Sequence, residues 1–256
     1  MKKILFSLSL VLFMKFSWAE QKTDTVSIHQ GIFKPFFKEL KDNDIVIKAF
    51  LMDKFPVTNE KFNHFVKTHP DFQKSRIIKL FADQRYLQDW KSDQLTEAEL
   101  QLIGKKPVTF VSWFAAKKYC QSLDMRLPTI AEWEYASDST DPEILKSLLA
   151  WYSQTGDHPL SDVGQQKPNK FGLYDMHGVI WEWVDDFSSV MISSDSRSKG
   201  DRTDGFFCGG GSVSSLDSKS YATFMRYGFR SGLKGDYNMK NLGFRCVQDS
   251  SKAGAK

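Results

Sequence analysis

Residues Asn169 to Trp183 have the sequence NKFGLYDMHGVIWEW, which mixes turn-forming and aromatic residues and shows no helical periodicity. The same composition, rich in Gly, Asn, Asp, Ser and aromatic residues, extends from Trp151 to Val247. It predicts turns and short strands throughout this half of the chain. Such a long irregular segment is stable only if its backbone polar groups are paired, and a calcium ion or a disulfide is a usual way to fix it.

The other half of the chain shows clearer periodicity. Short apolar runs at residues 45–47 and 49–51 predict strands. Three helices are predicted from an N-terminal capping residue followed by apolar residues at helical spacing. Their caps and inward residues are Thr58 with Phe62, Phe65 and Val66, ending before Pro70; Ser112 with Ala115, Ala116, Tyr119, Cys120 and Leu123; and Thr129 with Glu132, through Tyr135. The stretch from Phe72 to Lys106 is helix-prone in parts and is not assigned.

The composition is that of a folded protein. The 256 residues are 41% hydrophobic and 26% charged, and they include 21 Phe and 7 Trp. These values exclude a disordered chain, collagen and a coiled coil. No internal repeat or Pro/Ser-rich linker divides the chain, so one mixed domain is expected.

The N-terminus has the pattern of a secretory signal peptide. Lys2 and Lys3 precede an apolar run at residues 4–13, and a small-x-small cleavage pattern ends at Ala19. We therefore expect a signal peptide at 1–19, a folded domain at 20–249 and a frayed tail at 250–256. The mature protein would be exported, without a transmembrane segment and most simply periplasmic, although Lys15 beside the cleavage site leaves a retained anchor as the alternative.

The charge of the mature chain argues against nucleic-acid binding. Residues 1–19 contain three lysines and no acid, so their removal lowers the formal net charge from +4 to +1. No basic run is longer than Lys105-Lys106. A nucleic-acid surface needs clustered basic residues, so this class is rejected.

Six separated motifs together resemble the sulfatase-modifying-factor family, that is, formylglycine-generating enzymes and their relatives. Besides residues 169–183 they are PVTNEKF at 56–62, PVTFVSW at 107–113, RLPTIAEWEYA at 126–136, GGS at 210–212 and NLGFRC at 241–246. The resemblance runs from about Val26 to Val247. It implies a single α+β domain related to the C-type-lectin fold, with little regular secondary structure.

The resemblance implies a structural calcium ion. Asp175 would provide a side-chain oxygen, Gly178 and Ile180 backbone carbonyls, and Glu182 a carboxylate, and these hard oxygen donors suit Ca²⁺. In the alternative interpretation Asp175 only caps a turn and Glu182 only pairs with a buried arginine. A second calcium site of some relatives is not expected, because the region after Ala150 is short.

The three cysteines suggest one disulfide and one leftover thiol in an exported protein. The resemblance implies that the disulfide joins Cys120 to Cys246, which leaves Cys208 free. Cys208 would then be a redox group, a metal ligand or an intermolecular partner, or simply an inert buried residue.

The resemblance breaks at the catalytic cysteines. Formylglycine-generating enzymes hold Cu(I) with two cysteines soon after the Gly-Gly-Ser element, because soft thiolates select that ion. Here Ser215 and about Ser220 stand in their places. The protein should therefore not make formylglycine, and it is similar to relatives linked to pyoverdine maturation or to copper nitrite reductase.

Two functions follow from these expectations. The first is oxidative maturation of an exported peptide or small molecule by an oxidoreductase whose redox metal is unknown, in a pocket with Trp181 as aromatic wall, Ser212 as hydroxyl donor and Arg230 as cation. In the structural interpretation, Trp181 belongs to the core, Ser212 satisfies a turn and Arg230 binds a carboxylate. The second function is a non-catalytic, calcium-stabilised accessory that helps to assemble a periplasmic enzyme.

Overall fold

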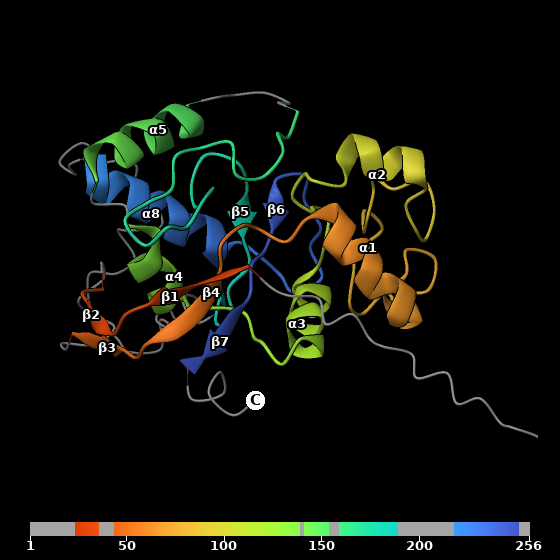
Figure 1. Cartoon of the computed structure of the whole chain (residues 1–256), viewed down its shortest axis with the longest axis horizontal. Helices are drawn as coiled ribbons and strands as arrows, with labels where there is room; N and C mark the ends of the chain where they lie inside the picture. Colours follow the sequence, from red (N-terminus) through yellow and green to blue (C-terminus); the bar gives the residue numbers. More distant parts are fainter. Residues whose placement is uncertain (1–23, 36–43, 139–140, 154–158, 189–217, 251–256) are drawn as a thin grey trace, which may run out of the picture.

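The computed structural model describes residues 24–35, 44–138, 141–153, 159–188 and 218–250 (Figure 1). Short strands and helices alternate with long irregular segments, as the sequence predicts. The elements are β1 (Thr25–Ile28), β2 (Gly31–Phe33), β3 (Ile45–Ile47), β4 (Phe50–Asp53), α1 (Asn59–Thr68), the 3₁₀ turn η2 (Pro70–Phe72), α2 (Glu97–Ile103), α3 (Trp113–Ser122), α4 (Ile130–Ser137), α5 (Pro142–Tyr152), β5 (Trp181–Glu182), α8 (Ser218–Ser231), β6 (Leu242–Gly243) and β7 (Val247–Asp249).

Strand pairing brings the two ends of the described chain together. β1, β4 and β7 form an antiparallel sheet in the order β1-β4-β7, in which Met52 pairs with Val26 on one side and with Val247 on the other. β2 and β3 form a separate antiparallel pair. β5 and β6 are parallel, which places Glu182 beside Gly243. The motif at residues 169–183, which contains Glu182, therefore lies beside the motif at residues 241–246.

The three predicted helix starts are confirmed. The Thr58 hydroxyl accepts a hydrogen bond from the backbone N–H of Lys61 at 3.3 Å. Ser112 caps α3 in the same way. Thr129 and Glu132 form a complete capping box, with the Thr129 N–H donating to the Glu132 carboxylate at 2.8 Å. These caps satisfy backbone N–H groups that have no partner within their helix.

One hydrophobic core connects the halves. Phe62 on α1 stacks on Tyr119 of α3 at 5.8 Å between ring centroids, and both rings contact Phe244 edge-on. The predicted inward residues of the first two helices are buried, except that Leu123 is only half-buried. Aromatic rings arranged in this way add about 0.5–1.5 kcal/mol per pair to the area they bury.

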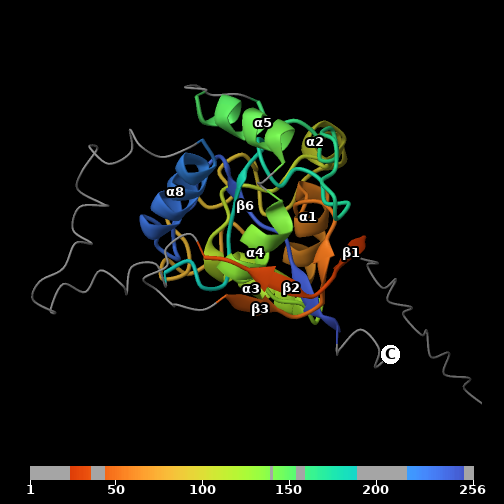
Figure 2. The same ribbon diagram turned by 90° about the vertical axis from the view of Figure 1, so that its left-hand side faces the viewer.

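The expectation of only turns and short strands after Trp151 is wrong, because α8 is a 14-residue helix. Its buried residues are Ala222, Arg226, Tyr227 and Arg230. Apolar residues do recur at helical spacing there, at Tyr221, Met225 and Phe229, but the sequence analysis did not recognise the helix. α5, which lies beside α8 (Figure 2), and α2 were also not assigned from the sequence.

Among the described residues, none of the helices has both the length and the apolar character that a membrane span requires.

Candidate functional site

The centre of the site is Glu182 at the end of β5. Its side chain is fully buried, and both of its oxygens accept hydrogen bonds from the Arg245 guanidinium at 2.9–3.0 Å. The indole N–H of Trp133 donates to the same carboxylate at 2.7 Å. Such a set of donors offsets the cost of burying the charge.

Arg245 also binds backbone carbonyls from two other segments. Its guanidinium donates to the carbonyl of Asp53, the last residue of β4, at 3.1 Å. It also donates to the carbonyl of Tyr174 at 2.9 Å. One cation thus connects β4, the segment before Asp175 and the end of β5. The fully buried Arg245 therefore holds these segments together through its hydrogen bonds.

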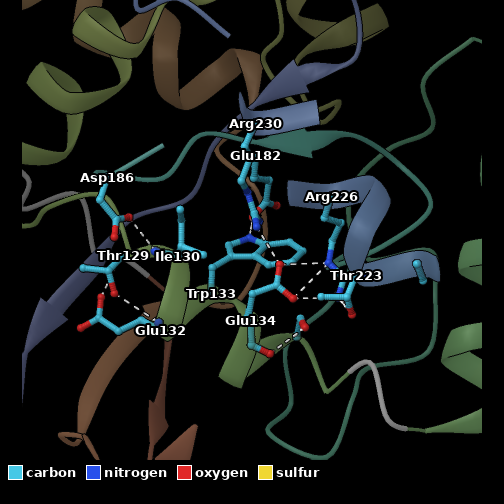
Figure 3. Close-up of polar contacts among 12 residues, drawn as sticks. Thr129, Ile130, Glu132, Trp133, Glu134, Glu182, Asp186, Thr223, Arg226 and Arg230 are labelled. Atoms are coloured by element: carbon cyan, nitrogen blue, oxygen red, sulfur yellow. Dashed lines mark hydrogen bonds and ion pairs between the residues drawn. The ribbon is translucent and has the colours of Figure 1, made fainter. Parts of the chain in front are cut away.

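A second buried carboxylate, Glu134 on α4, is shared by two arginines of α8 (Figure 3). Arg226 donates to it at 2.7 Å and Arg230 at 2.6 Å, and all three side chains are at most 4% exposed. Burial alone would raise the pKa of Glu134, but the attraction of the two guanidinium groups outweighs it and lowers that pKa to about 2. Glu134 is therefore ionised at neutral pH and holds α8 against α4.

The structure shows Arg230 with a carboxylate partner, as in the structural interpretation. It also lies over the Trp133 ring, 4.7 Å from the ring centroid. Because Trp133 donates to Glu182, it connects the Glu134 and Glu182 clusters. Arg230 therefore contributes to a buried polar network at the site, and it shares the Glu134 carboxylate with Arg226.

Trp181 lies in a cluster of aromatic rings. It stacks on Phe229 at 4.3 Å and on Tyr152 at 5.4 Å, with nearly parallel ring planes in both pairs. Trp151 is 5.0 Å away. The indole is only partly buried, so it belongs both to the core edge and to the surface beside α5 and α8.

Trp181 and Arg230 line one small cavity, so the structure brings two of the three predicted pocket residues together. The cavity has a volume of about 10 Å³, which is space for no more than one water molecule. Ser212, the third pocket residue, and Cys208 lie outside the described residues.

The predicted calcium ligands fit the ion only in part. Asp175 adopts a left-handed backbone with φ of 56°, and one carboxylate oxygen accepts from the Gly164 N–H. Its other oxygen is buried without a hydrogen-bond partner among the described residues, so it is available to bind a cation. Glu182, in contrast, is saturated by Arg245 and Trp133. Calcium binding remains a prediction. Of the four predicted ligands, Glu182 fits the ion least, because its carboxylate already binds Arg245 and Trp133.

His177, two residues later, is buried and neutral. Burial lowers its pKa to about 3, although a hydrogen bond to the Ser137 backbone opposes that shift. The ring meets Trp133 edge-on at 5.6 Å. Its Nε2 atom has no hydrogen-bond partner among the described residues. The sequence analysis assigned no role to this histidine.

The implied disulfide is present. Cys120 on α3 is bonded to Cys246, the residue before β7, across a sequence separation of 126 residues, and both cysteines are fully buried. It ties the second predicted helix to the C-terminal motif.

Asp53 gives a testable pH dependence of stability. Its carboxylate accepts from the Cys246 N–H at 3.0 Å, and burial raises its pKa to about 6, although this hydrogen bond opposes the shift. A raised pKa means that the folded protein holds the proton more tightly than the unfolded chain, so stability falls as the pH rises from 3.8 through about 6 and stays at the lower value above it. We expect Asp53→Asn to increase the free energy of unfolding by up to about 3 kcal/mol well above that pH.

Urea unfolding from acidic to mildly alkaline pH measures this effect. The gain from Asp53→Asn should shrink as the pH falls through 6 and should vanish near the ordinary value of 3.8. A gain that is independent of pH would show that Asp53 does not titrate as argued.

The fold and the site together define a class of protein. An α+β domain with little regular structure is organised around two buried acid–arginine clusters and one long-range disulfide. The model of the sulfatase-modifying factor enzyme 1-like domain matches residues 13–250, and the chain belongs to that family.

Two formylglycine-generating enzymes are similar to this chain over most of its length. Bos taurus formylglycine-generating enzyme is 27% identical over an alignment of 256 positions, which covers 80% of this chain and 67% of that protein. The Mus musculus enzyme is 30% identical over 63% of this chain and 49% of its own length. The chain thus spans between about half and two thirds of these enzymes.

Two further comparisons concern a relative named inactive and a solved structure. Inactive C-alpha-formylglycine-generating enzyme 2 of Bos taurus is 26% identical, covering 82% of this chain and 80% of that protein. The structure of PvdO from Pseudomonas aeruginosa has a TM-score of 0.50 at 18% identity, covering 88% of this chain and 94% of that one. This likeness shows the formylglycine-generating-enzyme type of fold.

Proposed function

We propose that this protein is an exported maturation or assembly factor that binds a client protein and does not make formylglycine. The observation that carries the proposal is the use of its cysteines. The chain has three cysteines, and two of them form the Cys120–Cys246 disulfide. One cysteine per chain remains, so a Cu(I) site made of two thiolates from one chain is not available.

Export is supported by two independent features. The N-terminal residues have the pattern of a signal peptide. The disulfide is of a kind that persists in oxidising compartments such as the periplasm. Both features are expected of a protein that acts on its client outside the cytoplasm.

The geometry of the predicted pocket favours binding over redox chemistry. Arg230 is paired with Glu134, which it shares with Arg226, and Trp181 packs against rings of its own chain. The cavity that the described residues form between them holds no more than one water molecule. The partly exposed aromatic cluster of Trp151, Tyr152, Trp181 and Phe229 offers a surface of the kind that is enriched at protein interfaces.

The experiment combines a conversion assay with client capture. The mature protein, loaded with Cu(I), is incubated with a sulfatase-derived cysteine peptide, and no aldehyde product is expected. In parallel, cross-linking in the periplasm should yield a saturable complex with one client, which is weakened by Trp151→Ala. The matched control is the same mature protein carrying Phe81→Ala, which removes an aromatic ring outside the cluster. Conversion of the peptide, or a complex indifferent to Trp151→Ala, would overturn the proposal.

A second candidate is oxidative maturation of a small molecule by a centre of another kind. The observation in its favour is that two buried arginines lie beside the Trp133 and Trp181 indoles, in the place that the resemblance assigns to the pocket. Stoichiometric copper or iron in protein purified without chelator would favour this function. Protein without such a metal that still supports its client would favour the first.

We expect calcium to stabilise the protein. A bound ion at one hundred times its dissociation constant adds about 2.7 kcal/mol to the free energy of unfolding. Its ligands would be Asp175 and the carbonyls of Gly178 and Ile180, with Glu182 remaining paired to Arg245. The measurement is the melting temperature in calcium and in chelator.

The control for calcium is Asp175→Asn, which should lose most of the calcium-dependent increase. Equal melting temperatures of the unmodified protein in calcium and in chelator would contradict the prediction.

A further inference from the structure

Two exposed apolar side chains lie in a turn at residues 74–81, between η2 and α2, with the sequence KSRIIKLF. Ile78 is 54% exposed and Leu80 is 74% exposed. The Phe81 N–H donates to the Ile78 carbonyl at 2.9 Å, so the two side chains belong to one tight turn. Single exposed apolar residues are common on protein surfaces, but two on one turn form a small patch, and the residues around it indicate its partner.

The backbone of this turn is fixed at both ends. At its start, the backbone N–H and the hydroxyl of Ser75 both donate to the Asp93 carboxylate at 2.7 Å. At its end, Ala82 is buried, and the N–H of Asp83 donates to the Asp236 carbonyl at 2.8 Å. The chain therefore holds the two apolar side chains at the surface in a defined conformation, and contact with a partner requires little further ordering of the backbone.

All charged residues of the turn are basic. Lys74, Arg76 and Lys79 are the only charged residues from position 72 to position 82. Arg76 and Lys79 are exposed, whereas Lys74 is half-buried and donates to the backbone carbonyl of Trp90. Lys79 lies between the two apolar residues in the sequence, so apolar and cationic groups are presented by the same part of the turn.

Nearby acids neutralise only part of this charge. The charged residues of the turn and of the segments bonded to it are the bases Lys74, Arg76, Lys79, Arg85 and Lys234 and the acids Asp71, Asp83, Asp93 and Asp236. Five bases against four acids leave an excess of one positive charge. Asp83 is paired with Arg85 at 3.1 Å, and Asp93 lies near Lys74 and Arg76. The excess therefore lies around Lys79, next to the two apolar side chains.

We infer that this turn docks the protein on an anionic lipid surface. Ile78 and Leu80 insert at the boundary between the headgroups and the acyl chains. Arg76 and Lys79 contact the lipid phosphates, since long basic side chains reach the headgroups while the residues beside them are inserted. Contact of this kind holds a protein at a membrane without a spanning segment.

A lipid surface fits the patch better than a second protein does. A stable protein interface covers about 800 Å² on each partner and needs a complementary shape. Two aliphatic side chains and two exposed bases are too few for such an interface, but a lipid surface adapts to them and surrounds them with negative charge. An acidic protein is therefore the alternative partner that the experiment must exclude.

The inference does not depend on the proposed client. The client surface consists of Trp151, Tyr152, Trp181 and Phe229, and the turn shares no residue with it. Loss of lipid binding with an intact client complex would overturn only this inference. Loss of the client complex with intact lipid binding would overturn only the proposed function.

Flotation of the mature protein with lipid vesicles tests the inference. Residues 1–19 are left out, because their apolar run would bind lipid by itself. Vesicles of phosphatidylcholine with phosphatidylglycerol should bind the protein saturably, and vesicles of phosphatidylcholine alone should bind it at least tenfold more weakly. Leu80→Ser should weaken binding to the anionic vesicles about tenfold. The matched control is Leu102→Ser on α2, because Leu102 is similarly exposed, at 72%, and lies in another segment.

A second pair of variants tests the charge. Lys79→Gln should weaken binding about fivefold, because the attraction of one base to the anionic surface is lost. Lys67→Gln, in the last turn of α1, is its control and should bind as the unmodified protein does. Both lysines are exposed, so neither change disturbs the fold.

Three results would each overturn the inference. They are the absence of saturable binding to the anionic vesicles, equal binding to both kinds of vesicle, and equal binding by Leu80→Ser and Leu102→Ser. Capture of an acidic protein through the turn, without binding to vesicles, would overturn it as well.

Discussion

Glu134→Gln is expected to lower the free energy of unfolding by about 3–5 kcal/mol, because it leaves two buried arginines without their shared carboxylate. The side chains of Glu134, Arg226 and Arg230 are 2–4% exposed, so water cannot replace the lost partner. Urea unfolding followed by tryptophan fluorescence measures the change. α8 depends on this carboxylate for its position, so the surface beside Trp181 should be disturbed as well.

The same carboxylate predicts an acid transition. The pKa of Glu134 is about 2 in the folded protein and 4.5 ordinarily, a difference that corresponds to about 3 kcal/mol. Since the folded pKa is the lower one, this contribution is fully present above pH 4.5 and is lost as the pH falls toward 2. The stability difference between the unmodified protein and Glu134→Gln should therefore shrink over that interval.

Two variants control for the prediction. Glu60→Gln changes an exposed glutamate in the first turn of α1 and should cost no more than about 1 kcal/mol. Combining Glu134→Gln with Arg226→Met removes an uncompensated cation and should recover part of the loss, because the two positions are in contact. A cost of Glu134→Gln no larger than that of Glu60→Gln would show that the cluster does not hold α8.

The elements that the sequence predicted are those whose signals are local. Thr58, Ser112 and Thr129 cap their helices through groups three residues away, and such spacing is visible in the sequence. The family motifs supplied what spacing could not, namely the partner of Cys120. A disulfide across 126 residues leaves no trace in local patterns.

The parts that were missed depend on buried charge. Arg226 and Arg230 face inward on α8, where apolar residues would be expected, and their common partner Glu134 is too distant in the sequence to be found from local spacing. The roles of Glu134 and Arg245 are equally long-range, since their oppositely charged partners are 63 to 96 residues away. His177 had one signal, its place in the Asp175 to Glu182 motif, but its missing donor is a property of packing alone.

Replacing both Cys120 and Cys246 by Ala is expected to lower the free energy of unfolding by about 4–5 kcal/mol in the chain-entropy description of a loop of this length, with strain or residual structure reducing that value. The effect arises in the unfolded chain, which gains conformational freedom when the long loop is no longer closed. Both residues are fully buried, and Ala is chosen because it places no hydroxyl in the core. Urea unfolding with and without reductant measures the change.

The reductant provides the control. It should destabilise the unmodified protein about as much as the double substitution does, and it should leave the Cys120→Ala/Cys246→Ala variant unchanged. Thiol labelling of the unfolded protein without reductant should modify one cysteine of the three, because the other two are bonded. Labelling of all three would contradict the disulfide. It would also mean that the chain has three free thiols. Two of them could then bind Cu(I), and the proposal that the protein has no two-thiolate copper site would lose its basis.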